Sequence, residues 1–324
     1  MTGRRVALPA LLVAAACLVG AQTQAPIFRT GVDVVLVDVS VRQGGEAVTG
    51  LSSADFELID SGVPQTIESS ALESIPVDLT LLLDTSGSTE GRLLERLKQG
   101  VLDTVQLLRP DDRVRVIAVQ HVLNEVLPLQ PARDPVPIDR LSAQGGTALY
   151  DGLAAVMMRP AATGRRQLIV AYTDGDDASS ITSPSQALEI ALHAEAVVHV
   201  VVPVEDDRSR QGAAGGPAPA RVEQGRAAEA QTRARAMTLE SAAGVFPNES
   251  TLRAAAGRTG GRVFVVGLED SISAAFRDVL DDYRRSYLLR YTPQGVPREG
   301  WHDIVVRVKK PGAYEVRARR GWGG

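Results

Sequence analysis

Apolar runs of strand length alternate with amphipathic stretches of helix length through the middle of the chain. The runs lie at residues 79–83, 114–119, 167–172 and 197–204, and turn residues bound them. Such runs are typical of buried strands in a parallel sheet. Residues 90–108 carry apolar side chains three and four positions apart, which places one face of a helix inward: Leu93, Leu94, Leu97, Val101, Val105 and Leu108. The pattern predicts an α/β fold of strand–helix–strand units with right-handed crossovers.

Turn and capping signals predict the remaining elements of this middle segment. Residues 122–127 are expected to pair antiparallel with the strand before them. A glycine-rich loop at 145–151 opens a helix, and Ser183-Pro184-Ser185-Gln186 forms a capping box with proline at the first helical position. We expect that second helix to run to about residue 196. The last predicted elements are a helix from about residue 249, a strand at 262–266 and a helix at 270–283.

The two ends of the chain favour β-structure instead. Residues 34–41 are rich in β-branched side chains and precede a Gly44-Gly45 turn, and a second turn–strand–turn unit covers 51–64. Near the other end, strands are predicted at 286–291, 303–309 and 314–319, the last two joined by the tight turn Lys310-Pro311-Gly312. Because the N-terminal fragment is too short to bury a large core alone, we expect both ends to form one small β-sandwich flanking the α/β domain.

These patterns divide the chain into segments. We predict a signal peptide at 1–21, an N-terminal β segment at 26–74, an α/β domain at 76–283 and a C-terminal β segment at 284–324. Within the α/β domain, residues 205–245 are dominated by glycine, alanine, proline, arginine and glutamine. We expect an exposed insertion there, disordered in its first half and helical from about 221 to 241.

The first residues have the composition of a secretory leader. Arg4 and Arg5 precede an apolar stretch at 6–19, and Val19-Gly20-Ala21 supplies a small-x-small cleavage pattern. We expect cleavage after Ala21, with Ala25 as the second choice, and therefore an exported protein that is periplasmic, secreted or on the cell surface. The apolar stretch is shorter than a membrane span requires, and no later stretch is long enough either. Lipidation at Cys17 is the disfavoured alternative, because its weak processing box lacks the usual leucine.

Composition and charge exclude several classes of function. The 324 residues are 44% hydrophobic and 23% charged, with a formal net charge of −4, which offers no footprint for nucleic acid. Cys17, the only cysteine, lies inside the predicted leader, so the mature chain needs no disulfide. One basic cluster near the end is interpreted as a solvated strand face: Lys309, Lys310, Arg317, Arg319 and Arg320.

Oxygen-bearing side chains follow two of the predicted central strands. Asp84, Ser86 and Ser88 come directly after the first run, and Asp174 ends a later one. Thr147 stands in the glycine-rich loop between them. Because ligands bind beyond the carboxyl ends of parallel strands, we expect these five residues to form one site. Oxygen-only ligands suit a hard divalent cation; Mg²⁺ fits best, and Mn²⁺ or Ca²⁺ would also be accepted.

The charge count indicates what such a site would do. Two carboxylates neutralise a divalent cation and three hydroxyls add no charge, so a sixth position can take an external carboxylate. The structural alternative is helix capping, by Asp84 and Ser88 at the first helix and by Thr147 at the next. Other polar residues are interpreted as structural. Asp176 and Asp177 are expected to be solvated loop charges, and Asn248 a helix cap rather than a glycosylation acceptor. The four histidines are expected to be surface or core residues without a metal or catalytic partner: His121, His193, His199 and His302.

The ordered motif Asp84-x-Ser86-x-Ser88, Thr147, Asp174 resembles the metal-ion-dependent adhesion site of the von Willebrand factor type A domain, and the resemblance covers residues 76–283. The leader, the strands ending near Asp55-Phe56 and the terminal 287–322 segment are similar to secreted bacterial proteins with a domain of this type. The resemblance implies a Rossmann-like, doubly wound, mainly parallel sheet and metal-bridged recognition of proteins. It implies no particular partner.

We therefore expect a non-enzymatic exported protein whose metal shell is completed by a glutamate or aspartate of a protein partner. One alternative is a structural envelope module with a vestigial site, and another is a metal-dependent hydrolase. Hydrolysis is disfavoured because neither a histidine nor a third carboxylate is clearly placed as a general base. Ser86 replaces the second acid of an aspartyl-phosphate mechanism, and no Gly-x-Ser-x-Gly elbow surrounds it.

Overall fold

A six-stranded sheet lies at the centre of the computed structural model, which describes residues 34–72, 75–204, 246–267 and 271–323. The strand order is β11-β10-β9-β6-β7-β8, and only the β7–β8 pair is antiparallel. All eight residues of β6 are buried, as expected for a strand covered on both faces. The strands are β6 (Val77–Asp84), β7 (Arg113–Val119), β8 (Leu123–Pro131), β9 (Arg166–Tyr172), β10 (Val197–Val204) and β11 (Val263–Gly267).

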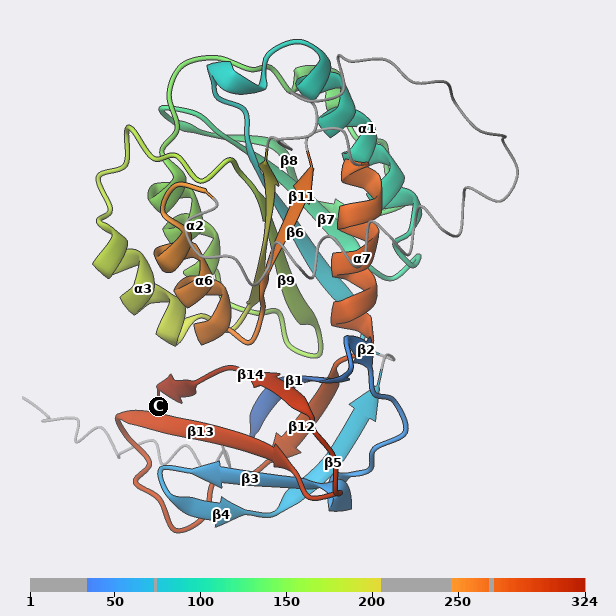
Figure 1. The fold of residues 1–324 in the computed structure, drawn as a ribbon, viewed down its shortest axis with the longest axis vertical. Helices are drawn as coiled ribbons and strands as arrows, with labels where there is room; N and C mark the ends of the chain where they lie inside the picture. Colours follow the sequence, from blue (N-terminus) through green and yellow to red (C-terminus); the bar gives the residue numbers. More distant parts are fainter. Residues whose placement is uncertain (1–33, 73–74, 205–245, 268–270, 324) are drawn as a thin grey trace, which may run out of the picture. The chain divides into compact units, whose positions relative to one another are not determined.

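Helices cover both faces of this sheet (Figure 1). On one face lie α1 (Arg92–Gln106) and α7 (Ile272–Arg284), and on the other α2 (Leu149–Met157), α3 (Pro184–His193) and α6 (Glu249–Arg258). The predicted inner face of α1 is correct, because Leu94, Leu97 and Val101 are buried. The predicted capping box at α3 is present, with the Gln186 N–H donating to Ser183 Oγ at 3.3 Å. The helix ends at His193, earlier than expected. These features confirm the predicted doubly wound α/β fold.

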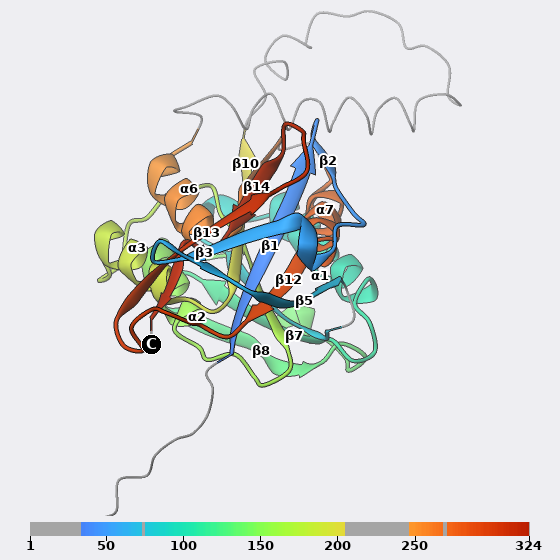
Figure 2. The ribbon, with the colours of Figure 1, turned by 90° about the horizontal axis from the view of Figure 1, so that it is seen from below.

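Strands from both ends of the chain form a β-sandwich with its own core (Figure 2). One sheet has the order β14-β1-β12-β5, with β2 beside β1, and the other β15-β13-β3-β4. The expected flanking sandwich is therefore present. Each end contributes to both sheets, whereas we expected the C-terminal strands to form one half together. The strands are β1 (Val35–Gln43), β2 (Glu46–Ala47), β3 (Phe56–Asp60), β4 (Val63–Gln65), β5 (Ile67–Leu72), β12 (Tyr287–Tyr291), β13 (Trp301–Val308), β14 (Glu315–Ala318) and β15 (Gly321–Gly323).

A buried polar cluster lies inside this sandwich. His302 Nδ1 is 2.8 Å from Asp60 Oδ1, and the Tyr291 hydroxyl donates to Asp60 Oδ2 at 2.8 Å. Trp322 donates from Nε1 to the Tyr291 hydroxyl at 2.9 Å and stacks on the His302 ring. His302 is a core residue as expected, and its contact with Asp60 is one that the sequence did not predict. Asp60 and His302 are far apart in sequence and meet only because β3 pairs with β13.

The basic cluster near the C-terminus is only in part a solvated face. Lys309 and Lys310 are exposed, and Lys310 Nζ lies 3.1 Å from Asp55 Oδ2. Arg319, in contrast, donates to the Gly321 carbonyl at 2.6 Å, and burial lowers the pKa of its guanidinium. Arg319 follows β14 and forms a β-bridge with Thr259 at the end of α6, which accounts for this difference.

Two of the predictions fall on other parts of the chain. The leader at 1–21, with its lipidation alternative at Cys17, and the insertion at 205–245 lie outside the described residues. Among the helices that the structure describes, none combines the length and the apolar character needed to cross a membrane.

Candidate metal centre

The carboxyl ends of β6 and β9 place the two predicted acidic ligands at one edge of the central sheet. Leu83 pairs with Tyr172 in parallel register, so Asp84 and Asp174 follow at the same end. The glycine-rich loop closes on this edge through two backbone bonds: Gln144 N–H to the Thr85 carbonyl and Gly87 N–H to the Gly145 carbonyl, both at 2.9 Å. Gly145 has a φ of +69°, a backbone conformation that glycine adopts without strain.

Hydrogen bonds connect the five predicted site residues in one group. The hydroxyls of Ser86 and Ser88 are 3.0 Å apart, and Ser88 donates to Asp174 Oδ2 at 3.1 Å. Thr147 donates to Asp84 Oδ1 at 3.3 Å. The structure thus brings together every residue that we predicted for the site. Their role as metal ligands stays a prediction.

Asp84 is a buried carboxylate without a cationic partner among the described residues. It is 3% exposed and accepts hydrogen bonds from the Ser86 N–H at 3.1 Å and the Thr173 hydroxyl at 3.1 Å. Burial raises the pKa of the Asp84 carboxyl; the Ser86 bond partly opposes this, and the charge of Asp174 raises the pKa further. The ionised form that the site needs is therefore unfavourable without a compensating positive charge.

The donor set fits a hard divalent cation. It consists of carboxylate and hydroxyl oxygens only, the ligands that Mg²⁺, Mn²⁺ and Ca²⁺ prefer. A cation there would also offset the repulsion between Asp84 and Asp174. Within the described ranges, no group of three or more histidine, cysteine or acidic side chains is arranged to hold a metal ion. A site at this edge would therefore depend on hydroxyl ligands beside its two carboxylates.

The helix-capping alternatives are wrong for all three residues. Helix α1 begins only at Arg92, its N-cap is Gly91, and no side chain caps it. A short 3₁₀ turn at Gly87–Thr89 intervenes, which separates Asp84 and Ser88 from the helix start. The N-cap of α2 is Ala148, again without a side-chain cap. Thr147 therefore lies one residue too early, and its hydroxyl points to Asp84 instead.

Two other loop residues differ from expectation. Asp177 was expected to be a solvated charge, but it accepts the Leu149 N–H at 2.8 Å and so satisfies the start of α2. Asp176 is exposed, as expected. Asn248 occupies the N-cap position of α6 but makes no capping bond, and its amide donates to the Gly175 carbonyl at 2.8 Å. Asn248 therefore holds the loop that carries Asp174.

Sequence reasoning missed two residues that position the site. Thr173 is fully buried, donates to Asp84 and accepts the Gly175 N–H at 3.0 Å, so it links both acidic loops. Gln120 donates to the Thr85 hydroxyl at 3.3 Å and to the Ser142 carbonyl at 2.8 Å. The only sequence signal was the place of Thr173 directly before Asp174. His121, whose ring lies against Gly145, makes no hydrogen bond to the five residues within the described structure.

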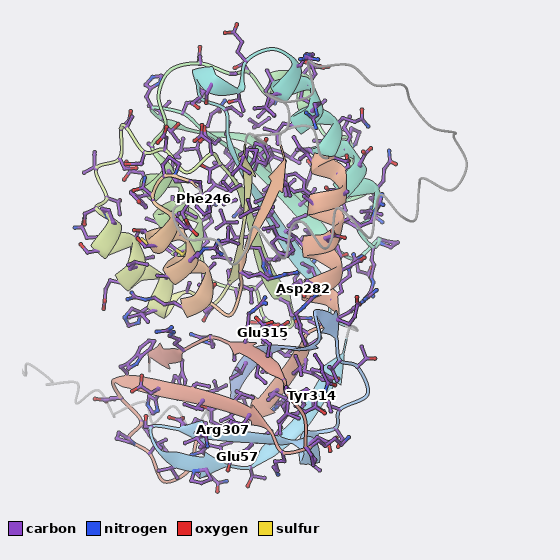
Figure 3. The ribbon with its side chains drawn as sticks, viewed as in Figure 1. Glu57, Phe246, Asp282, Arg307, Tyr314 and Glu315 are labelled. Atoms are coloured by element: carbon purple, nitrogen blue, oxygen red, sulfur yellow. The ribbon has the colours of Figure 1, made fainter. Side chains whose placement is uncertain are left out.

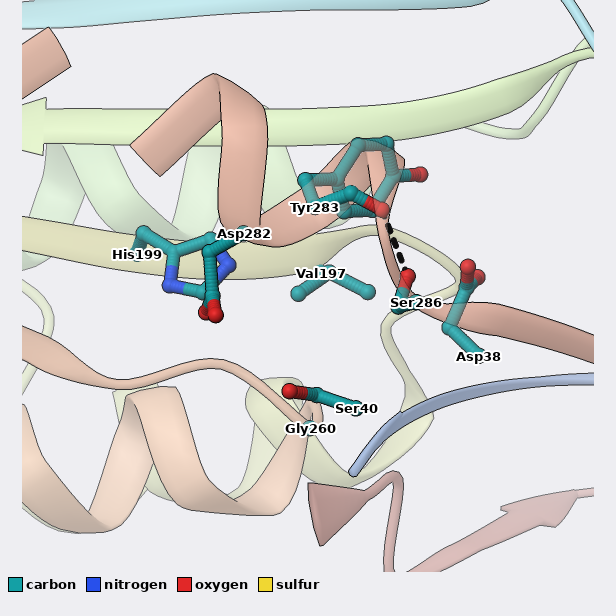
Figure 4. Close-up of a pocket in the computed structure, with 8 residues that line it drawn as sticks. All are labelled: Asp38, Ser40, Val197, His199, Gly260, Asp282, Tyr283 and Ser286. Atoms are coloured by element: carbon teal, nitrogen blue, oxygen red, sulfur yellow. Dashed lines mark hydrogen bonds between the residues drawn. The ribbon is translucent and has the colours of Figure 1, made fainter. Parts of the chain in front are cut away.

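A second polar site, between β1, β10 and α7, is too small for a ligand (Figure 4). The cavity of about 10 Å³ is bordered by Asp38, His199, Asp282 and Ser286, and has room for at most one water. Burial lowers the pKa of His199 to about 4, so its imidazole is neutral at neutral pH. The surrounding acids have partners: Arg166 binds Asp38, and Arg42 binds Asp282. This polar seam is structural.

Comparison with known proteins matches the central domain. The family described as von Willebrand factor type A domain matches residues 78–218. An uncharacterized protein of Synechocystis sp. is 37% identical over 110 residues, which cover 32% of this chain and 26% of that protein. The chain thus matches about a quarter of the length of this curated relative.

Several solved structures are similar at low sequence identity. A von Willebrand factor type A protein from Catenulispora acidiphila is 14% identical with a TM-score of 0.46, over 89% of this chain and 62% of that one. An aerotolerance-related membrane protein from Bacteroides fragilis is 17% identical with a TM-score of 0.44, over 64% and 99%. Proximal thread matrix protein 1 from the mussel byssus, with a zinc-occupied MIDAS motif, is 14% identical with a TM-score of 0.43, over 68% and 48%. At these values the likeness does not extend to function.

Proposed function

Because this chain contains a von Willebrand factor type A domain, we propose that it binds a protein partner through a divalent cation held by the residues of the candidate metal centre. The observation that carries the proposal is the buried Asp84 carboxylate, which lies beside Asp174 and has only hydroxyl and amide partners in the described structure. A buried charge of this kind needs a compensating one.

Each residue has a distinct part in the proposed site. Asp84 and Asp174 supply the negative charge, and Ser86, Ser88 and Thr147 supply neutral oxygens. A bound divalent cation would be electrophilic and would accept a carboxylate from outside the chain. Thr173 and Gln120 position the loops that carry these ligands. Mg²⁺ is the proposed ion, with Mn²⁺ or Ca²⁺ as substitutes.

The proposed partner is a protein that presents a glutamate or aspartate, and the proposed activity is binding rather than catalysis. Hydrolysis would need a general base within hydrogen-bond reach of an attacking water. In the described part of the chain, His121 makes no bond to the five residues, and the neighbouring Asp177 is engaged at the start of α2. The leader predicted at 1–21 supports export, so the partner is proposed to be an envelope or extracellular protein.

Capture of partners from a cell-envelope extract tests this function. The full chain is immobilised with Mg²⁺ or with EDTA, and Asp174→Asn is compared with Asp176→Asn. Asp176 is exposed and stands two residues further on, so its variant removes the same charge outside the ligand set. We expect capture by the wild type and by Asp176→Asn in Mg²⁺, and none in EDTA or with Asp174→Asn.

Capture that survives both EDTA and Asp174→Asn would contradict the proposal. It would favour the alternative of a structural module with a vestigial site. A captured protein would next be tested for substitution of its exposed acidic residues, one of which must abolish binding.

A further inference from the structure

A cavity of about 260 Å³ lies at the opposite edge of the central sheet from Asp84. It opens where β6, β7 and β9 begin, beneath the end of α2. Its polar lining is dominated by arginine, and its apolar lining comes from strand and helix side chains. Its lining includes Asp78, Arg113, Arg115, Arg159, Val156 and Ile169. We call this the arginine cavity.

Guanidinium groups outnumber carboxylates around the arginine cavity. Asp78 accepts from Arg113 Nε at 2.8 Å and from Arg165 Nε at 2.5 Å, so one carboxylate serves two arginines. Glu125 likewise lies 3.0 Å from Arg115 Nε and 3.7 Å from Arg159 Nη1, although neither Glu125 nor Arg165 lines the cavity itself. Of the lining residues, three are arginines and Asp78 alone is acidic, which leaves two positive charges in excess along the wall.

Arg115 has a buried nitrogen, Nε, without a hydrogen bond in the described structure. Its side chain is 15% exposed, and although Nε lies 3.0 Å from Glu125, the contact does not have hydrogen-bond geometry. Burial lowers the pKa of the Arg115 guanidinium, and the charge of Arg159 lowers it further. Arg115 and Arg159 thus share the single carboxylate of Glu125 at a partly buried wall, where a further anion in the cavity would offset the remaining positive charge.

We propose that the arginine cavity binds a small organic dianion, either a phosphate monoester or a dicarboxylate. The excess of two positive charges matches a doubly charged oxyanion, and the guanidinium of Arg159 can offer two parallel N–H donors to it. Apolar walls that include Val156 and Ile169 receive the carbon part of the ligand. This site is independent of the proposed metal centre, because it uses none of its residues.

Isothermal titration calorimetry tests the assignment on the full chain. Inorganic phosphate and succinate are titrated separately in the presence of EDTA, which keeps divalent cations out of the measurement. Sodium chloride at equal ionic strength measures general salt effects. We expect saturable binding of one anion per chain for phosphate, for succinate or for both, and none for chloride. The two arms distinguish the two sources of the oxyanion.

Substitutions locate the binding. Arg159→Gln removes a half-exposed charge and is expected to weaken binding at least about tenfold, and Arg115→Gln is expected to act in the same way. The matched control is Arg307→Gln on β13, because Arg307 is 65% exposed, lies beside Glu57 (Figure 3) and is not one of the residues that line the cavity. It should bind as the wild type does.

Two results would overturn the proposal. One is the absence of saturable heat with both phosphate and succinate. The other is wild-type affinity in folded Arg159→Gln and Arg115→Gln proteins, with folding verified by circular dichroism. Neither result would affect the proposed metal centre, and loss of metal binding would not affect this one.

Discussion

The two ends of strand β6 carry buried aspartates in opposite electrostatic settings. Asp78, at the start, is 5% exposed and binds Arg113 and Arg165. Asp84, at the end, is 3% exposed and has only hydroxyl and amide donors. The same residue type, on the same strand and at a similar depth, is compensated by cations at one end and, among the described residues, by none at the other.

This difference separates a structural carboxylate from a candidate ligand. A buried charge is costly unless it is paired and hydrogen-bonded. Arginines of the same chain pair with Asp78, so its carboxylate stabilises the folded state. Among the described residues, Asp84 has only hydroxyl and amide donors with a second carboxylate beside it, so we propose that a bound cation compensates its charge. The following predictions test this distinction.

The largest expected effect is on stability at the compensated end. Asp78→Asn leaves Arg113 and Arg165 without their shared carboxylate. Because both arginines are partly exposed, we expect the free energy of unfolding to fall by about 3 kcal/mol, the lower limit for breaking a buried ion pair. Chemical denaturation measures it. The control Glu125→Gln, whose carboxylate is 39% exposed, should cost under about 1 kcal/mol. Equal losses of unfolding free energy in the two variants would mean that the burial of Asp78 does not strengthen its contribution to stability.

Asp84→Asn should have the opposite effect at the other end. Removing an uncompensated buried charge is expected to stabilise the metal-free protein while abolishing stabilisation by Mg²⁺. In the wild type, Mg²⁺ at a hundred times its dissociation constant should add about 2.7 kcal/mol. Thermal unfolding with Mg²⁺ and with EDTA measures both effects. A Mg²⁺-dependent shift retained in Asp84→Asn would show that Asp84 is not a ligand.

Thr173 should contribute to metal affinity by positioning Asp84 and the loop that carries Asp174. Thr173→Val removes the hydroxyl that donates to Asp84 and accepts from Gly175, and we expect metal affinity to fall about 10- to 100-fold. Thr173→Ser keeps the hydroxyl and should retain most of the affinity. Competition with a fluorescent metal chelator measures both variants. If the valine and serine variants bind alike, the hydroxyl does not position Asp84.

The smallest expected effect is the pH dependence. The pKa of Asp84 is raised, so the native state binds its proton more tightly than the unfolded chain does. In the metal-free protein, this group therefore lowers stability as pH rises from the ordinary value of 3.8 through the raised native value. The stability gained by Asp84→Asn should consequently shrink on acidification. Metal binding should weaken over the same interval, because it requires the ionised form. If the stability difference between Asp84→Asn and the wild type did not change with pH, the raised pKa of Asp84 would be contradicted.

The sequence predicted much of the fold because its strongest signals are local. The strand at 79–83 lies inside β6, and the predicted 197–204 strand coincides with β10, since long apolar runs bounded by turns have few alternatives. The five candidate ligands were found because their order along the chain matched a motif. The start of α1 was predicted two residues early, at 90 instead of Arg92, because the segment after β6 first forms a 3₁₀ turn at Gly87–Thr89.

Contacts between distant residues could not be predicted from local patterns. The Asp60–His302 pair depends on the register of β3 against β13. The arginine cavity depends on Arg113 and Arg115 facing α2 from a strand whose alternate residues enter the opposite core. In both cases the sequence shows the residue types, but which residues contact each other depends on how the strands pair in the folded sheets.

Calorimetric titration of Mg²⁺ into the metal-free full chain measures directly whether Asp84 and Asp174 hold a cation. We expect saturable binding of one ion per chain in the wild type and in Asp176→Asn, and no detectable binding in Asp174→Asn. Equal heats in Asp174→Asn and Asp176→Asn, or no binding to the wild type, would contradict it.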